Sequence, residues 1–315
     1  MTLDNIKEEI NGAKNIVILT HDVPDGDAIG SSLAMYIGLK QLGKDVDVVI
    51  PKYSKTYEFL PFAEEIKEEG RIENYDLAIA LDCGDIKRLN GFANYFEYAN
   101  CKISIDHHEA NTMFADYNFV DPTAPACAQI LLMVLKALNI EITKDIGTCL
   151  LTGIITDTGG FKYQSVKAET FEFAAELLNR GVNVSDIYRK VLQTISLEKF
   201  NLRKIAMNRI ELLEDGKIAF TYITKKDEEQ TKSEDHNGIV EMGRDIEGVE
   251  VSIFLREVDE NSYKISLRSN DYVNVSDICL MFNGGGHIRA AGGSISLPFE
   301  KAKEKIVLEC KKNLK

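Results

Sequence analysis

Short strand-like segments alternate with helical patterns through the first half of the chain. The strand-like segments cover residues 16–20, 46–50, 77–81 and 102–105, the first of them a continuous apolar run, and the helical patterns cover residues 28–42, 126–138, 144–155 and 168–179. A continuous apolar run between turn residues is typical of a strand buried on both faces, and strand–helix alternation is typical of a parallel sheet. The first half is therefore expected to fold as an α/β domain with a parallel sheet.

The pattern changes between residues 185 and 213, where one long helical stretch is expected to connect two domains. Beyond it, residues 249–258 and 262–267 face each other across a short polar turn, which predicts a hairpin. Residues 225–237 form the most polar segment and are expected to be a solvated loop or surface helix. The predicted organisation is an N-terminal α/β domain, a helical linker and a smaller α/β domain, over residues 1–190, 191–212 and 213–315.

Charge and cysteine content exclude several classes of protein. The chain has 37 Lys and Arg against 50 Asp and Glu, a net charge of −13, and so repels long duplex DNA but not short nucleic acids or phosphate esters. Its six cysteines form no C-x-x-C pair, which favours reduced thiols over a zinc ribbon or disulfide scaffold. No signal peptide is visible, and no apolar stretch reaches the roughly 20 residues that span a bilayer. We expect a soluble cytoplasmic protein with no membrane partner.

Acids and histidines gather directly after the predicted strands. Three of the five histidines stand there, each near aspartates. Ligands bind at the carboxyl ends of the strands in an open α/β sheet, so these side chains should meet at one edge. They are His21, Asp25, Asp27, Asp82, Asp106, His107 and His108. Asp157, at the end of a helical pattern, is expected to join them.

Carboxylates held close together cannot all stay ionised unless a proton or a metal ion compensates them. Carboxylate and imidazole ligands suit Mn²⁺, Mg²⁺, Fe or Zn, and an excess of oxygen donors favours the harder ions. These aspartates and histidines are more ligands than one ion needs, but two ions bridged by a carboxylate and a hydroxide would use them. Such a pair of ions catalyses the hydrolysis of phosphoesters. Asp22 and Asp85 are expected to be helix N-caps. In an extended chain the side chains of His107 and His108 would point to opposite faces, one to metal and one to substrate.

The second half carries three consecutive glycines followed by His287. Residues without side chains let backbone N–H groups approach a ligand closely, although a plain turn also explains a glycine run. Arg268 ends a predicted strand and suits bidentate phosphate recognition. The direction of the nearby Arg289 is left open. The expected substrate contacts of this half are Arg268, Ser269, Gly284, Gly285, Gly286 and His287.

Five motifs together resemble the DHH/DHHA1 phosphoesterase superfamily, in order and in spacing, over nearly the whole chain. They are H-D-V-P-D-G-D-A (21–28), L-D-C-G-D (81–85), D-H-H (106–108), T-D-T-G (156–159) and G-G-G-H (284–287). The compact length, without further nucleic-acid-binding modules, is most similar to the NrnA-type bifunctional oligoribonucleases and 3′-phosphoadenosine 5′-phosphate (pAp) phosphatases. The resemblance implies a DHH catalytic domain and a DHHA1 substrate-binding domain.

The resemblance also implies a role for each residue at the predicted edge of the sheet. One Mn²⁺ would be held by His21 and Asp25, with Asp82 bridging to a second Mn²⁺. The second ion would take Asp27, His107 and Asp157, and Mg²⁺ or Co²⁺ are alternative metals. His108 would contact the substrate or leaving group, and so would be catalytic together with Asp82. Asp106 would orient one of the histidines without binding a metal ion itself.

The implied activity is hydrolysis of short single-stranded RNA to mononucleotides, of pAp to AMP and phosphate, or of both. A phosphodiesterase acting on c-di-AMP or linear pApA uses the same core and stays an alternative. A family II pyrophosphatase would lack the glycine–histidine motif, and a RecJ-type exonuclease would need a long basic groove. A non-catalytic nucleotide-binding module would have lost ligands that are all present. Monomer and homodimer both stay open.

Overall fold

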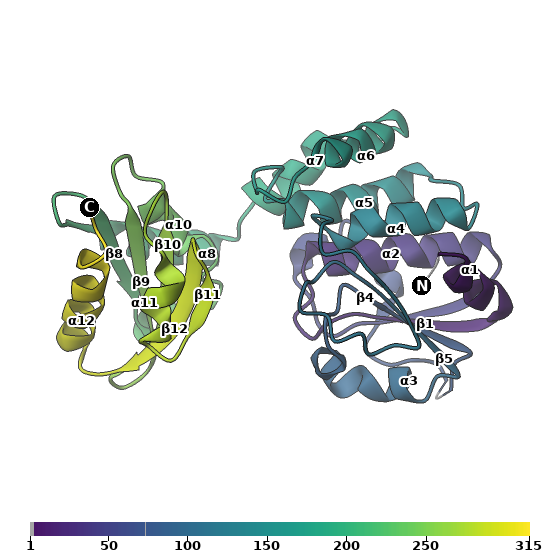
Figure 1. The fold of residues 1–315 in the computed structure, drawn as a ribbon, viewed down its shortest axis with the longest axis horizontal. Helices are drawn as coiled ribbons and strands as arrows, with labels where there is room; N and C mark the ends of the chain where they lie inside the picture. Colours follow the sequence, from purple (N-terminus) through teal and green to yellow (C-terminus); the bar gives the residue numbers. More distant parts are fainter. Residues whose placement is uncertain (1–2, 73) are drawn as a thin grey trace. The chain divides into compact units, whose positions relative to one another are not determined.

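The computed structural model describes residues 3–72 and 74–315 and divides into two compact units between Thr194 and Ile195. Figure 1 shows the fold of each unit, a sheet with helices against it. None of the described helices combines the length and apolarity that crossing a bilayer requires.

The first unit is built on a six-stranded sheet in which every neighbouring pair is parallel, in the order β3-β2-β1-β4-β5-β6. The four predicted strands are confirmed as β1, β2, β4 and β5. The short strands β3 and β6 were not predicted, because neither has a continuous buried apolar run. The strands are β1 (Asn15–Leu19), β2 (Asp45–Val49), β3 (Ile66–Lys67), β4 (Leu77–Leu81), β5 (Cys101–Asp106) and β6 (Tyr117–Val120).

Helices cover both faces of this sheet, as the buried central strands β1 and β4 require. Ile16 and Ile18 of β1 belong to the core that α2, α4 and α5 cover, whereas Val17 and Leu19 belong to the core that holds Phe96 of α3. The helices are α1 (Leu3–Gly12), α2 (Gly26–Gln41), α3 (Ala93–Glu97), α4 (Cys127–Ala137), α5 (Lys144–Asp157), α6 (Ala168–Asn179) and α7 (Val184–Tyr188). Short helical turns are η1 (Lys55–Tyr57), η2 (Ala63–Glu65), η3 (Ile86–Phe92) and η4 (Arg189–Gln193).

Helices α2 and α5 approach each other closely through glycines. A Cβ on Gly30 of α2 would lie 2.4 Å from the carbonyl oxygen of Cys149, and a Cβ on Gly153 of α5 would lie 2.5 Å from Oδ1 of Asp27. No side chain fits at either position without a shift of its neighbours. This contact places the C-terminal end of α5, which carries Asp157, beside the first turn of α2.

The prediction of one long connecting helix is wrong. The helical path from α7 continues through the π turn η4 and ends at Thr194, whose backbone is extended. A new helix, α8 (Leu197–Asn208), then begins after Ser196. The Ser196 hydroxyl accepts the N–H of Lys199 at 3.1 Å, so this serine is an N-cap that starts a separate helix.

The second unit has a mixed sheet in the order β11-β12-β10-β9-β8-β7, parallel only between β8 and β9. Helices α11 and α12 contribute to the core on one face, and α8 and α10 to the core on the other. The predicted hairpin is confirmed as β9 and β10, and the polar segment from residue 225 begins as helix α9. The elements are β7 (Glu211–Leu213), β8 (Ile218–Ile223), α9 (Lys225–Thr231), α10 (Ile239–Arg244), β9 (Val251–Asp259), β10 (Ser262–Ser269), α11 (Val275–Leu280), β11 (Gly285–His287), β12 (Ala290–Ser296) and α12 (Phe299–Lys311).

A buried ion pair in the second unit gives an acid-dependent contribution to stability. Burial raises the pKa of Asp227, but hydrogen bonds from Arg209 and Thr224 outweigh it and lower the pKa below its usual value. The contribution is therefore present above the unfolded-state pKa and is lost as the pH falls through the folded-state pKa. Asp227→Asn is expected to cost about 2 kcal/mol at pH 7. In urea titrations the difference from the wild type should stay constant from pH 7 down to about pH 5 and shrink as the pH falls further through about 4. A difference that stays constant to the lowest pH at which the chain folds would contradict this account.

Candidate metal centre

The first motif lies in the loop between β1 and α2. Thr20 Oγ1 donates to the carbonyl oxygen of Leu81 at 2.7 Å, which ties the end of β1 to the end of β4. His21 follows and is buried, with 3% exposed. Asp25 is the N-cap of α2, where its carboxylate accepts the N–H groups of Asp27 and Ala28 at 3.0 and 3.1 Å. One Asp25 oxygen is thus fixed by the helix, which orients the carboxylate.

Asp27 is wholly buried and is held from a distant part of the chain. Its two oxygens accept the N–H groups of Cys127 and Ala128 at 2.5 and 2.9 Å, and Ser31 Oγ donates to Oδ1 at 3.2 Å. Helix α4 has no side-chain cap of its own, since Ala126 stands at its N-cap. Asp27 therefore caps α4 across about a hundred residues of sequence, and the positive end of the helix dipole favours its charge.

Asp82 follows β4 in a strained backbone conformation. Its φ is +53°, which non-glycine residues rarely adopt and which often marks a functional position. The N–H of Asp82 donates to the carbonyl oxygen of Ile105 at 3.0 Å, which holds the residue between β4 and β5. The side chain is buried, with 2% exposed. This conformation presents the carboxylate to the histidines that follow β5.

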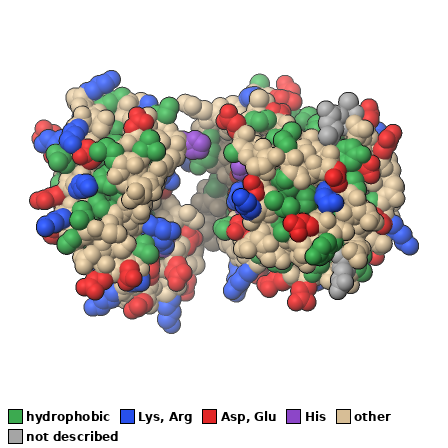
Figure 2. Space-filling model, turned by 60° about the horizontal axis from the view of Figure 1, so that its bottom comes forward, with side chains coloured by type: hydrophobic (Ala, Val, Ile, Leu, Met, Phe, Trp, Pro, Cys, Tyr) green, Lys and Arg blue, Asp and Glu red, His purple; other side chains and the backbone are tan. Residues whose placement is uncertain are grey.

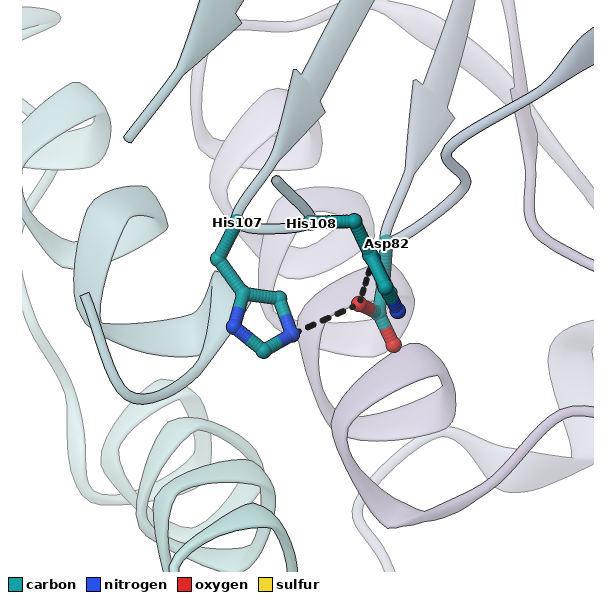
Figure 3. A group of neighbouring side chains, drawn as sticks. All are labelled: Asp82, His107 and His108. Atoms are coloured by element: carbon teal, nitrogen blue, oxygen red, sulfur yellow. Dashed lines mark ion pairs between the residues drawn. The ribbon is translucent and has the colours of Figure 1, made fainter. Parts of the chain in front are cut away.

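The two adjacent histidines converge on Asp82 (Figure 3). Nε2 of His107 lies 3.4 Å from Oδ1 of Asp82, and Nδ1 of His108 lies 3.7 Å from the same oxygen. Their ring centroids are 4.7 Å apart, so the expectation that they point to opposite faces is wrong. The reason is that β5 ends at Asp106, and the chain leaves the extended conformation at the histidines.

Asp106 is wholly buried and organises the histidine segment. It accepts the N–H of His107 at 2.8 Å, Nδ1–H of His108 at 2.7 Å and Nδ2–H of Asn111 at 2.7 Å. Nδ1 of His107 contacts the carbonyl oxygen of Ala124 at 3.3 Å, which assigns the proton to Nδ1 and leaves Nε2 for a ligand. The contact from Asn111 was missed in the sequence, where nothing distinguishes this asparagine from a turn residue.

Burial and mutual charge repulsion together determine the electrostatics of these carboxylates. Burial, followed by the charges of Asp82 and Asp157, raises the pKa of Asp25 and raises that of Asp27 well above its usual range. Burial also raises the pKa of Asp82, but its interactions with His107 and His21 outweigh this and lower the pKa. The carboxylates likewise overcome the effect of burial on His107 and raise its pKa to about 11. A positive charge is therefore strongly favoured here, as a proton or as a cation.

The donor atoms fit divalent cations. Asp82 Oδ1 and His21 Nδ1 are buried without a hydrogen-bond partner among the described residues, so each has capacity for a ligand. Carboxylate oxygens with imidazole nitrogens are suitable ligands for Mn²⁺ or Mg²⁺. Within each of three groups, one donor atom per residue lies within 4.8 Å of the others: His21, Asp25 and Asp82; Asp27, His107 and Asp157; and Asp82, His107 and His108. The structure thus brings together all six residues predicted to hold metal.

Asp85 and Asp22 lie beside this centre but outside these groups. Asp85 is the N-cap of η3 and accepts the N–H of Lys87 at 2.8 Å, which confirms the cap predicted for it. The prediction of a side-chain cap at Asp22 is not borne out, because helix α2 takes Asp25 as its N-cap.

The glycine–histidine segment of the second unit is an edge strand rather than a loop. Residues Gly285 to His287 form β11, which pairs with β12. A Cβ on Gly284 would lie 1.9 Å from the carbonyl oxygen of Gly292, and one on Gly286 would lie 2.6 Å from that of Ala290. These two glycines are required by the hairpin itself. A Cβ on Gly285 would meet only Leu280, at 3.9 Å, so the fold leaves space there.

The polar residues near β11 differ in the hydrogen bonds that they already make within the second unit. Arg268 donates from Nε to Glu241 at 3.0 Å and from Nη1 to its own neighbour Leu267. Ser269 is buried and its hydroxyl donates to the carbonyl oxygen of Val273 at 2.6 Å, so its side chain is not placed to contact a substrate as the sequence predicts. Arg289 also donates to Val273, at 2.9 Å, which settles its direction toward its own domain.

Comparison with known proteins matches both units. The model of the DHH family N-terminal domain matches residues 15–154, and that of the DHHA1 domain matches residues 215–315. The bifunctional oligoribonuclease and PAP phosphatase NrnA of Thermus thermophilus is 34% identical, over 93% of this chain and 88% of the relative. An exopolyphosphatase-related protein from Bacteroides fragilis is 30% identical in sequence, with a TM-score of 0.87 over 98% of this chain and 95% of that one.

A more distant structure shares the fold alone. RecJ of Thermus thermophilus, solved in complex with Mn²⁺, is 16% identical, with a TM-score of 0.51 over 98% of this chain and 54% of that one. The two matched domains, the similarity over most of the chain and the clustered acids and histidines agree with one another. On this evidence the chain belongs to the DHH/DHHA1 family of metal-dependent phosphoesterases.

Proposed function

We propose that this chain hydrolyses short oligoribonucleotides to mononucleotides and pAp to AMP and phosphate. The observation that supports this most is the convergence of donor groups from β1, β4, β5 and α5 at one edge of the parallel sheet. The name of the Thermus thermophilus relative, an oligoribonuclease and PAP phosphatase, supports the choice of substrate.

The donor groups divide between two cations, for which we propose Mn²⁺. His21 and Asp25 would hold one, Asp27, His107 and Asp157 would hold the other, and Asp82 would bridge the two. When bound, such a pair supplies a nucleophile near neutral pH and neutralises charge on phosphoryl oxygens. The free capacity of Asp82 Oδ1 and His21 Nδ1 supports this assignment.

His108 is proposed to act on the leaving group. Its side chain is 38% exposed, against 15% for His107, so it is the more accessible of the two rings. Asp106 binds Nδ1 of His108, which leaves Nε2 to hold a proton close to the oxygen that departs. Asp106 then positions both histidines without touching substrate.

We propose residues 1–190 as the catalytic domain, 191–212 as the linker and 213–315 as the substrate-binding domain. In the substrate-binding domain, Arg268 would bind a substrate phosphate, since its Nη2 makes no hydrogen bond or ion pair with the described residues. Gly284, Gly285, Gly286 and His287 would lie against the terminal nucleotide. Gly285 supports this most, because the fold itself does not require a glycine there.

Charge supports short, single-stranded substrates. The net charge is −13, and acidic and basic side chains are interspersed on the face shown in Figure 2. The net negative charge repels a long duplex, and the mixed charges on this face form no continuous basic groove, whereas a short substrate needs only local contacts. All six cysteines are free, in keeping with a cytoplasmic location.

The test is a side-by-side assay of pAp, a five-nucleotide RNA, pApA and c-di-AMP with Mn²⁺. We expect pAp to yield AMP and phosphate, and the RNA to yield mononucleotides. Turnover of c-di-AMP or pApA with neither pAp nor the five-nucleotide RNA cleaved would overturn the proposed substrates and favour a dinucleotide phosphodiesterase.

Replacement of Gly284 and of Gly285 by alanine is expected to affect different properties, stability in the first case and substrate binding in the second. Gly285→Ala is expected to leave the free energy of unfolding unchanged but to raise KM for RNA about tenfold, because a methyl group fits the fold and not the bound nucleotide. Gly284→Ala is expected to destabilise the chain by about 3 kcal/mol, because its methyl group clashes with Gly292. Urea titrations and steady-state kinetics check both. A wild-type KM for Gly285→Ala would remove this segment from the substrate site.

A further inference from the structure

The side chain of one partly buried arginine makes no hydrogen bond or ion pair with residues 3–72 or 74–315. Arg88 lies in η3, six residues after Asp82. Its guanidinium makes no hydrogen bond or ion pair with any residue that the structure describes. Arg209 and Arg268 are also partly buried, and they pair with Asp227 and Glu241. A cation that loses hydration without gaining a partner costs free energy, which an anionic ligand would offset.

Backbone hydrogen bonds fix the position of Arg88. Its N–H donates to the carbonyl oxygen of Asp85 at 2.9 Å, and its carbonyl oxygen accepts the N–H of Asp22 at 2.7 Å. The Asp85 side chain caps the same turn through the N–H of Lys87. The backbone of Arg88 is therefore anchored in the segment that follows β4 and to the loop that follows β1. These two segments carry His21, Asp25 and Asp82.

The backbone of Arg88 borders the segments that carry the first and second motifs, through its hydrogen bonds with Asp22 and Asp85. Burial raises the pKa of the Cys83 thiol to about 12, and the positive charge of Arg88 acts against this rise. His108 borders the same segment, since a Cβ on Gly84 would lie 3.5 Å from Cβ of His108.

We propose that Arg88 forms a subsite for a second phosphate of the substrate, the one that is not cleaved. This rests on the proposed function, in which the cations neutralise the phosphoryl group that is cleaved. The planar guanidinium offers several N–H donors in a geometry that matches phosphate oxygens, and here none is already used by a described side chain. In pAp the group it binds is the 5′-phosphate.

The experiment compares pAp with 3′-AMP, which lacks the 5′-phosphate. Arg88→Ala is expected to raise KM for pAp about thirtyfold with kcat nearly unchanged, and to leave KM for 3′-AMP at its wild-type value. Arg88→Lys should fall between the two, because it keeps the charge but loses the fork of donors. The matched control is Lys87→Ala, which removes an exposed cation from the same turn and should change neither KM.

Equal losses on both substrates, or no loss on pAp, would overturn the subsite. Thermal unfolding with and without pAp separates this result from failure of the proposed function. If the wild type cleaves neither nucleotide, the proposed function fails, and the subsite is then judged by whether pAp raises the melting temperature of the wild type and Lys87→Ala but not of Arg88→Ala. Equal shifts in all three proteins would exclude Arg88 as a phosphate ligand.

Discussion

Asp82→Asn is expected to lower Mn²⁺-dependent kcat by at least about a thousandfold, because loss of the carboxylate that we propose to bridge the ions would remove several kcal/mol of transition-state stabilisation. The substitution is nearly isosteric, and asparagine tolerates the positive φ of +53° that Asp82 adopts. The fold should therefore survive, with an unchanged circular dichroism spectrum. Mn²⁺ should raise the melting temperature of the wild type and have little effect on the variant.

The matched control for this variant is Asp85→Asn. Asp85 lies three residues further along the same segment, where it caps η3 without joining the donor groups. Asparagine caps a helical turn about as well as aspartate, so activity and stability should both stay near the wild type. Near-normal turnover by Asp82→Asn in Mn²⁺ would show that Asp82 does not bridge the ions. Equal losses in both variants would point to a general effect of charge.

Gly153→Ala is expected to destabilise the chain by about 3 kcal/mol and to impair activity as well. The new methyl group would lie 2.5 Å from Oδ1 of Asp27 and 2.8 Å from Cβ of Ala128. Asp27 cannot move freely, because it accepts the N–H groups that begin α4. Relief of the clash must therefore separate α2 from α5 or displace a proposed metal ligand.

Gly12→Ala is the control for the loss of a helical glycine. Gly12 ends α1, and a Cβ there would have no atom within 4 Å. Replacement of a helical glycine by alanine in open space is expected to stabilise the chain by about 0.5 kcal/mol. Thermal and urea unfolding of both variants checks the difference. An unchanged stability for Gly153→Ala would mean that α2 and α5 tolerate separation and that the glycine contact does not position Asp27.

The parts of the fold that local sequence patterns encode could be predicted. Strands β1 and β4 are continuous apolar runs, and buried parallel strands need such runs because both faces are covered. The acids and histidines of the centre follow strands, so the topology alone brings them to one edge. The periodicity of α2, α4 and α5 likewise follows from local sequence.

The parts that depend on contacts between distant residues could not be predicted. Nothing near Asp27 in sequence shows that it caps a helix beginning at residue 127. The convergence of His107 and His108 depends on where β5 ends, which Asp106 sets through contacts with residues on both sides of the turn. The edge strand β11 contains two glycines and lacks any apolar pattern, so the hairpin with β12 is visible only in the fold.

The most direct test of this account is a crystal structure of the protein grown with Mn²⁺, in which anomalous scattering locates the ions. The account predicts two manganese peaks, one bound by His21 and Asp25 and the other by Asp27, His107 and Asp157, with Asp82 between them. Absence of bound manganese, with these carboxylates satisfied by protonated histidines instead, would contradict it.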